Sequence, residues 1–241
     1  MTTWTTRAVA SELRPAAFDL WRAVEAQHVA STMPLVDSSA EQQVLERLVD
    51  QSKPSVPAGA SDRGLHWLLF TPFRYRPPPG GSRFRGENDP GVFYGAETVR
   101  TACAEVGYWR WRHLRDTPAL DSMPSRLQSV FRTAVAGSTI DLRVPPFVRD
   151  RGLWTQRSNH SACLDLGRMA RTAGAQVVRY ESVRDSRGGT CGAVLDAAAF
   201  ASRTPVELHG WMLTVTRSRV TWQRIDPMNP GVLEFAASGW E

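Results

Sequence analysis

The stretch GSRFRGENDPGVFYGAETVRTACAEVGYWRWR, residues 81–112, puts charged and aromatic side chains directly before the most regular helical pattern of the chain. The short apolar segment 92–97 follows a glycine and predicts a strand. Residues 97–116 then predict a helix, because apolar side chains recur at the spacing of one helix face. Those side chains are Val99, Ala102, Cys103, Val106 and Trp109. A loop, a strand and a helix are therefore expected in immediate succession.

Before this stretch, three further segments have a recognisable pattern. Residues 38–51 predict an amphipathic helix, capped by Ser38 or Ser39. Residues 51–62 are rich in Ser, Pro, Ala and Gly and predict a loop or linker. The run LHWLLFTPFRYR, residues 65–76, is densely apolar and aromatic, and it predicts a buried strand that ends near Pro72.

After residue 112 the chain alternates irregularly between short strands and helices. Strands are expected in 138–144, 175–183 and 190–196, a helix in 160–174 with Gly174 at its C-cap, and a hairpin turning around Arg217–Arg219. There is no internal repeat and no GxGxxG phosphate loop. The sequence therefore predicts an α+β fold, with mixed short strands and surrounding helices, rather than a doubly wound nucleotide-binding fold.

Composition narrows the class of protein. The 241 residues are 42% hydrophobic, which is enough for a single domain with a real core, residues 1–241. No apolar run reaches membrane-spanning length, and the N-terminus does not have the pattern of a signal peptide. Three widely separated cysteines fit buried thiols, and no His/Cys cluster has metal-ligand spacing. A cytoplasmic protein without a metal site or a membrane contact is expected.

The net charge of +5 is typical of a protein with affinity for nucleic acid. Lys53 is the only lysine, so 28 of the 29 basic residues are arginine, whose planar fork binds phosphate bidentately. Composition bias of the source genome would produce the same excess. The arginines are spread along the chain without a block of like charges.

Each candidate site residue has an ordinary structural interpretation when it is taken alone. Glu105 borders the apolar face of the predicted helix and could be a boundary carboxylate paired with an arginine. Tyr94, near the end of the predicted strand, could be a core residue. Arg83 and Arg85 could belong to a solvated basic loop.

Taken together and in order, these residues resemble the pattern of the RES domain family. The parts are Arg83-Phe84, a short Pro/Gly loop, Tyr94, the helix that carries Glu105, and Ser182 before a glycine-containing turn. Arg22 in FDLWRAV matches the arginine of the family's first strand. The resemblance covers residues 18–196. The segment 23–64 is longer than in compact members, as an N-terminal elaboration, and 205–241 is a C-terminal hairpin region.

The resemblance implies a fold similar to ADP-ribosyltransferases, with NAD as substrate and cleavage of the nicotinamide–ribose bond. RES proteins resemble toxins of bacterial toxin–antitoxin pairs. The ADP-ribose would pass to water, to phosphate or to a protein, including an enzyme of phosphoribosyl pyrophosphate synthesis. The expected partner is an antitoxin, a helical DNA-binding protein of the Xre type, that blocks the active-site cleft.

The resemblance also assigns roles to these residues. Glu105 would stabilise the developing oxocarbenium ion, Tyr94 would stack on nicotinamide, and Arg83 would bind the pyrophosphate. The loop before Tyr94 is about one residue longer than is common in the family, so Arg85 could replace Arg83. On an extended loop these two arginines would point to the same side. Arg22 would hold a second phosphate or the ribose, and Ser182 a ribose hydroxyl or the carboxamide.

Two other classes of function stay open. The interleaved arginine and tryptophan of YWRWRHLR, residues 108–115, could belong to a basic nucleic-acid-binding module. At helical spacing Trp109 belongs to the apolar face, however, so direct nucleic-acid binding is not the favoured interpretation. A non-catalytic interaction module is the other alternative.

Overall fold

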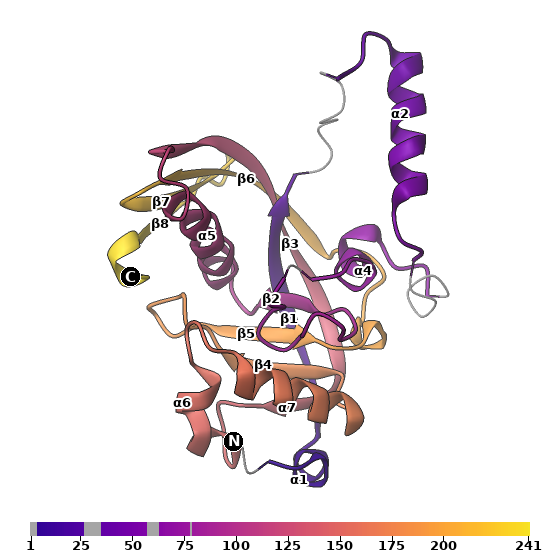
Figure 1. Cartoon of the computed structure of the whole chain (residues 1–241), viewed down its shortest axis with the longest axis vertical. Coiled ribbons are helices and arrows are strands. Elements are labelled where there is room, and N and C mark those ends of the chain that lie inside the picture. The colour runs from indigo at the N-terminus through magenta and orange to yellow at the C-terminus, as the bar shows by residue number, and fades with distance from the viewer. Residues whose placement is uncertain (1–3, 27–34, 57–62, 78) are drawn as a thin grey trace.

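The computed structural model describes residues 4–26, 35–56, 63–77 and 79–241. Within them, eight strands form one mixed sheet of order β1-β2-β5-β4-β3-β6-β7-β8, with helices packed around it (Figure 1). This confirms the α+β class expected from the sequence. No helix of the described residues is long and apolar enough to cross a membrane.

Five strands close into a ring. β1 (Arg14–Glu25) pairs antiparallel with β3 (Ser122–Asp141) along its whole length. β1 also pairs with β2 (Phe93–Ala96), β2 with β5 (Thr190–Val194), and β5 with β4 (Val177–Glu181). The parallel pairing of β4 with the end of β3 completes the ring. The ring brings β1, β2, β4 and β5, which are distant in sequence, to one place.

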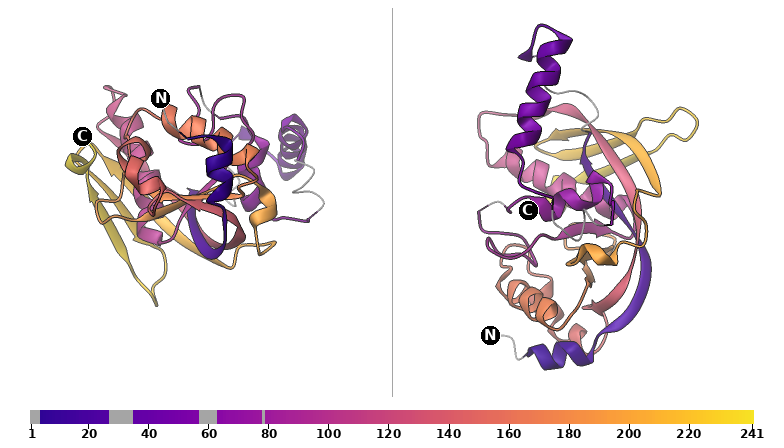
Figure 2. Two further views of the ribbon diagram at one scale, coloured as in Figure 1. Left: turned by 90° about the horizontal axis from the view of Figure 1, so that it is seen from below. Right: turned by 90° about the vertical axis from the view of Figure 1, so that its right-hand side faces the viewer.

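The remaining strands extend the sheet from the other edge of β3. β6 (Glu207–Thr216) pairs with the first half of β3, and β7 (Arg219–Arg224) and β8 (Val232–Ala236) follow in antiparallel order. β6 and β7 form the hairpin expected around Arg217–Arg219. In Figure 1 and in the right-hand view of Figure 2 these gold strands lie in the upper part of the molecule, whereas α1 (Thr6–Ser11) lies at the bottom.

The long helix α5 (Val99–Arg115) packs against β1, β6 and β7. α7 (Ser161–Thr172) packs against α1 and against α6 (Arg151–Trp154). Single 3-10 turns η2, η3 and η4 complete this part of the fold at Phe147–Asp150, Ala197–Ala199 and Ala237–Gly239. The positive φ of Gly174, two residues after α7, confirms the expected C-terminal glycine.

The helix predicted in 38–51 is α2 (Ser39–Ser52), and its apolar stripe is exposed at Val44, Leu48 and Val49. Part of the linker expected in 51–62 lies outside the described residues. The three cysteines are free and buried, as expected.

The strand predicted in 65–76 is wrong, because this segment forms the helix α4 (Trp67–Arg74). The ring of His66 caps the helix by accepting a hydrogen bond from the N–H of Leu68. A short continuous apolar run does not distinguish a buried strand from a buried helix, and Leu68 and Leu69 bury one side of the helix against the core. Pro72 lies inside the helix instead of ending a strand.

The apolar face predicted for α5 is partly wrong. Trp109 is 53% exposed, whereas Trp111 is almost completely buried beside Tyr108 and Trp240. The helix lies close to β7 at Gly107, where an added side chain would come within 3.1 Å of Val220. The buried side of the helix includes Ala104, Tyr108, Trp111 and Leu114.

The strand expected at 138–144 is only partly confirmed: β3 begins at Ser122 and ends at Asp141, and residues 142–144 form a turn. The first half of β3 is rich in polar residues and carries a register irregularity between Met123 and Arg126. Pairing with β1 on one edge and β6 on the other stabilises this strand where the local pattern is weak.

Candidate functional site

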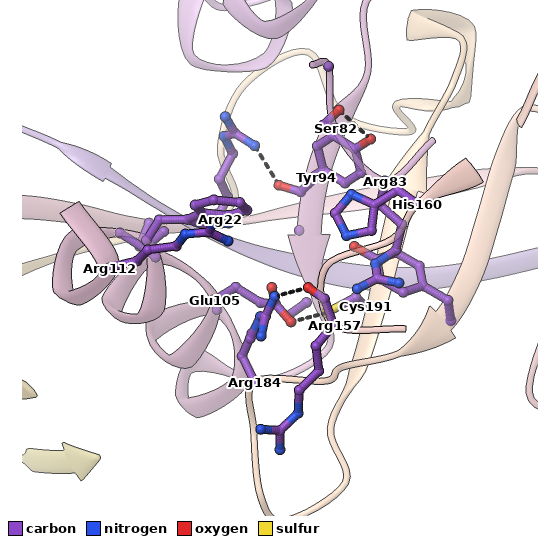
Figure 3. A pocket seen from close by; sticks show the side chains of 18 of the residues that line it. Arg22, Ser82, Arg83, Tyr94, Glu105, Arg112, Arg157, His160, Arg184 and Cys191 are labelled. Atoms are coloured by element: carbon purple, nitrogen blue, oxygen red, sulfur yellow. Dashed lines mark hydrogen bonds between the residues drawn. The ribbon is translucent and has the colours of Figure 1, made fainter. Parts of the chain in front are cut away.

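A solvent-facing cavity of about 570 Å³ opens between α5, β1, β2 and the turn after β4. Its volume is in the range of cavities that hold small-molecule ligands. Figure 3 shows Arg22, Tyr94, Glu105 and Arg184 around it, from β1, β2, α5 and the β4–β5 turn. The ring of strands thus assembles residues that are distant in sequence, such as Arg22 and Arg184, which are 162 positions apart.

Glu105 is the only carboxylate among the described residues that line this cavity. It comes from the middle of α5 and is half-buried. Its Oε1 accepts a hydrogen bond from the hydroxyl of Ser182, with an Oγ–Oε1 distance of 2.6 Å. The thiol of Cys191 lies 3.7 Å from the same oxygen. The carboxylate is therefore held in one orientation toward the cavity.

Ser182 lies behind Glu105 and not in the wall of the cavity. Its side chain is only 3% exposed, and its Oγ accepts hydrogen bonds from the backbone N–H groups of Arg184 (3.2 Å) and Asp185 (3.1 Å). With one donated and two accepted bonds, the hydroxyl has no capacity left for a ligand. The structure thus places Ser182 as a support for Glu105.

The β4–β5 turn is also attached directly to α5. The hydroxyl of Thr101 donates to Asp185 at 2.8 Å, and Arg100 forms an ion pair with the same carboxylate at 3.3 Å. A side chain on Gly189 would overlap Thr101 at 2.1 Å, so only glycine permits this close approach. These contacts fix the distance between Ser182 and Glu105.

Tyr94 and Arg22 form one wall of the cavity. The hydroxyl of Tyr94 shares a hydrogen bond with Ser82 (2.8 Å) and accepts another from the N–H of Phe84 (3.0 Å). Arg22 donates from Nη1 to the carbonyl of Tyr94 at 2.6 Å. Burial raises the pKa of the Tyr94 hydroxyl, so this group is protonated at neutral pH.

The Nε of Arg22 is buried and has no hydrogen-bond partner among the described residues. Burial lowers the pKa of its guanidinium to about 10, and the neighbouring Tyr94 partly opposes that effect. Arg22 is still a cation at neutral pH. A buried, incompletely paired cation is a candidate anion ligand.

Arg83 borders the cavity, but its guanidinium already donates hydrogen bonds to backbone carbonyls of the protein. It is 8% exposed, and it donates to the carbonyls of Trp154 at 2.7 Å and Gln156 at 3.0 Å. Cys163 lies 3.9 Å from Nη1. Arg83 therefore anchors the segment between α6 and α7 to the loop before β2.

Arg85 is not brought into this cavity. Its guanidinium donates to the carbonyls of Tyr75 (2.7 Å) and Asp89 (3.3 Å), on the side of α4. The expectation that Arg83 and Arg85 point to the same side is wrong, because the loop is not extended there. Ser82 and Arg85 exchange backbone hydrogen bonds of 2.7 and 3.2 Å, which makes a tight turn with Arg83 at its corner.

Sequence reasoning missed several lining residues, most of them cationic or aromatic: Trp21, Arg112, Arg157, His160, Tyr180 and Arg184. Arg112 follows Glu105 by two helical turns, and this spacing predicts that both side chains lie on the same face of the helix. Arg184 follows Ser182 by two residues. Its guanidinium lies 3.4 Å from the centre of the Tyr108 ring and donates to the carbonyl of Arg157 at 2.5 Å. Nothing in the local pattern indicates Arg157 or His160.

His160 carries a buried Nε2 without a partner among the described residues. Burial, and then the charges of Arg83, Arg184 and Arg112, lower the pKa of its imidazole to about 4. Between pH 6.5 and pH 4 the unfolded chain binds a proton that the folded chain does not, so the free energy of unfolding should fall as the pH falls through this window. Because the ring is partly solvated, we expect a loss on the order of 1 kcal/mol.

Urea unfolding of wild type and His160→Gln at pH 4.5 and 7 measures this effect. The pH dependence should be smaller in the variant, and His113→Gln, at an exposed position of α5, should behave as wild type. An equal difference in the free energy of unfolding between pH 4.5 and pH 7 in wild type and His160→Gln would contradict the lowered pKa of His160.

The described residues that line the cavity include one carboxylate and five arginines: Arg22, Arg83, Arg112, Arg157 and Arg184. Such a lining suits a ligand that is anionic overall and carries positive charge at one point, near Glu105. Among the described residues no group of His, Cys, Asp and Glu side chains could hold a metal ion.

Comparison with protein families finds one match: the model described as RES domain covers residues 56–216. The matched part includes the loop before β2, α5 and the β4–β5 turn, and thus most of the cavity. Comparison with curated proteins finds no match to the chain.

Proposed function

The chain belongs to the RES domain family, a family associated with toxin–antitoxin systems and NAD use, and on that basis we propose that it cleaves the bond between nicotinamide and ribose in NAD. The observation that carries the proposal is the oriented carboxylate of Glu105, the only one among the described lining residues of a cavity that also contains five arginines. NAD has the matching distribution of charge, with an anionic pyrophosphate and a cationic nicotinamide ring.

In the proposed reaction the bond between the ribose carbon and the nicotinamide nitrogen breaks, and its electron pair goes to the nitrogen. Nicotinamide leaves as a neutral molecule, and the ribose becomes an oxocarbenium ion. Glu105 stabilises this cation, and the hydrogen bond from Ser182 keeps its carboxylate in position. An acceptor oxygen then attacks the ribose carbon and loses its proton to solvent.

Tyr94 and the arginines have binding roles in this proposal. Tyr94 supplies a ring at the cavity wall for nicotinamide, and Arg22 supplies a cation for the pyrophosphate. Arg83 contributes its charge at the border of the cavity while it anchors the neighbouring segment. Ser182 acts through Glu105, and Arg85 has no contact with this cavity.

The biological role that we propose is that of a cytoplasmic toxin. Its cognate antitoxin, a helical DNA-binding protein of the Xre type, would cover the cavity, and loss of NAD or modification of a protein would arrest growth. The acceptor is water, phosphate or a protein, including phosphoribosyl pyrophosphate synthetase. We further propose one domain over 1–241, elaborated at 23–64 and 205–241.

The nucleic-acid alternative has less support. A stacking surface needs successive exposed aromatic rings, whereas Trp111 is buried and Trp109 borders the cavity.

Release of nicotinamide from NAD by the purified protein tests the proposal. Three parallel reactions, in buffer without phosphate, with phosphate and with cell lysate, distinguish the acceptors by their products. The expected products are ADP-ribose, ADP-ribose 1″-phosphate and an ADP-ribosylated protein. Absence of nicotinamide release in all three reactions would refute the enzymatic function.

A further inference from the structure

A second cavity of about 320 Å³ lies on the other side of the wall formed by Arg22, Ser82 and Tyr94. These three residues line both cavities. The far side of the second cavity is made by α4, which lies beside β2 (Figure 1), and by the segment after α4. The two cavities are thus adjacent compartments that share one polar wall.

The second cavity differs from the first in its chemistry. Trp67 and Tyr75 contribute aromatic rings that are 40% and 39% exposed. Arg22, Arg76 and Arg85 contribute positive charge, and no carboxylate lies among the described lining residues. Accessible rings together with arginines suit a flat aromatic group attached to an anion.

We propose that the second cavity binds the adenosine half of NAD, with the adenine stacked on Trp67. This inference rests on the proposed function. It extends that function by assigning the two halves of NAD to the two cavities. Nicotinamide and its ribose occupy the first cavity, and the pyrophosphate crosses the shared wall at Arg22.

The distribution of charge determines this orientation of NAD. The cationic end of the substrate belongs beside Glu105, which lines only the first cavity. Of the described residues that line both cavities, Arg22 alone is cationic, and its Nε has no hydrogen-bond partner within the described part of the chain. A pyrophosphate bound there leaves the adenosine on the side of α4, where exposed rings are present and carboxylates are absent from the described lining.

Trp67 is a suitable position for a test because its ring is accessible and lies in the first turn of α4, outside the fully buried core. Adenosine monophosphate is the probe, and its dissociation constant is measured by calorimetry. We expect Trp67→Ala to weaken binding about ten-fold, in line with the contribution of one base stacked on an aromatic ring. Trp67→Phe keeps a ring and should lose less than three-fold.

Leu208→Ala removes another exposed apolar side chain, from β6, and should leave binding of adenosine monophosphate unchanged. Thermal unfolding of all three variants verifies that they are folded. Three results would overturn the proposal. Wild type does not bind adenosine monophosphate, wild type binds it no more tightly than inorganic phosphate, or Trp67→Ala binds it as tightly as wild type. This readout needs no catalysis, so its failure is distinguishable from failure of NAD cleavage.

A kinetic comparison adds a second readout where nicotinamide is released. Trp67→Ala should raise KM about ten-fold for NAD and leave KM unchanged for nicotinamide mononucleotide, which has no adenosine. Equal increases for both substrates would place the effect of Trp67 in the first cavity and contradict the assignment.

Discussion

Glu105→Gln is expected to lower kcat for nicotinamide release about 10²–10³-fold, with the KM for NAD changed less than three-fold. Glutamine has nearly the same shape, and its side-chain oxygen can still accept the hydrogen bond from Ser182. The variant therefore removes the negative charge and preserves the packing. Because this charge matters most when the ribose becomes cationic in the transition state, the loss should appear mainly in kcat.

Glu234→Gln is the matched control for this substitution. Glu234 lies on β8, where it pairs with Arg219 at the surface, and the same loss of charge there should leave kcat unchanged. If kcat of Glu105→Gln equals that of wild type, Glu105 does not stabilise the oxocarbenium ion, and the proposed role of this residue is wrong.

Ser182→Ala separates orientation of the carboxylate from its charge. The variant loses the hydrogen bond to Glu105 and leaves two buried N–H groups, of Arg184 and Asp185, without their acceptor. We expect a smaller loss of kcat than in Glu105→Gln, and restoration of part of it in Ser182→Thr, which keeps a hydroxyl. A loss of stability alone, with kcat unchanged in the folded variant, would contradict the positioning role.

The second large effect is expected for Arg83→Met, which should lower the free energy of unfolding by about 2–4 kcal/mol. The substitution removes the donors to the carbonyls of Trp154 and Gln156 and leaves these groups without those partners beside a buried tryptophan. Urea unfolding measures the loss. Arg83→Lys keeps the charge but not the planar fork, so it should recover only part of the stability.

Arg14→Met is the control, because the guanidinium of Arg14 also donates to two carbonyls, of Ser11 and Leu13, but its side chain is 67% exposed. Its loss should cost less than about 0.5 kcal/mol. If Arg83→Met kept wild-type stability and only bound NAD more weakly, Arg83 would be a phosphate ligand, as the sequence suggested, and not an anchor.

Local patterns predicted β2, α5, α7 and the β6–β7 hairpin correctly, because each has apolar spacing or a turn signal within a few residues. The same reasoning failed for α4, where a short apolar run fits both a strand and a helix. It also placed Trp109 on the buried face of α5, where Trp111 lies instead, because the packing of the helix on β1, β6 and β7 exists only in the folded chain.

By itself the sequence determined the class of the fold and the family pattern, and it singled out Glu105, Tyr94 and Arg22, which line one cavity in the structure, because these features depend on residue types in a fixed order. The partners and the surroundings of these residues depend on the tertiary structure. The ring of strands brings Ser182 behind Glu105, and the tight turn at Ser82–Arg85 directs Arg83 toward Trp154 and Arg85 toward α4. Orientation of a side chain depends on backbone turns and on partners distant in the chain, which no local pattern contains.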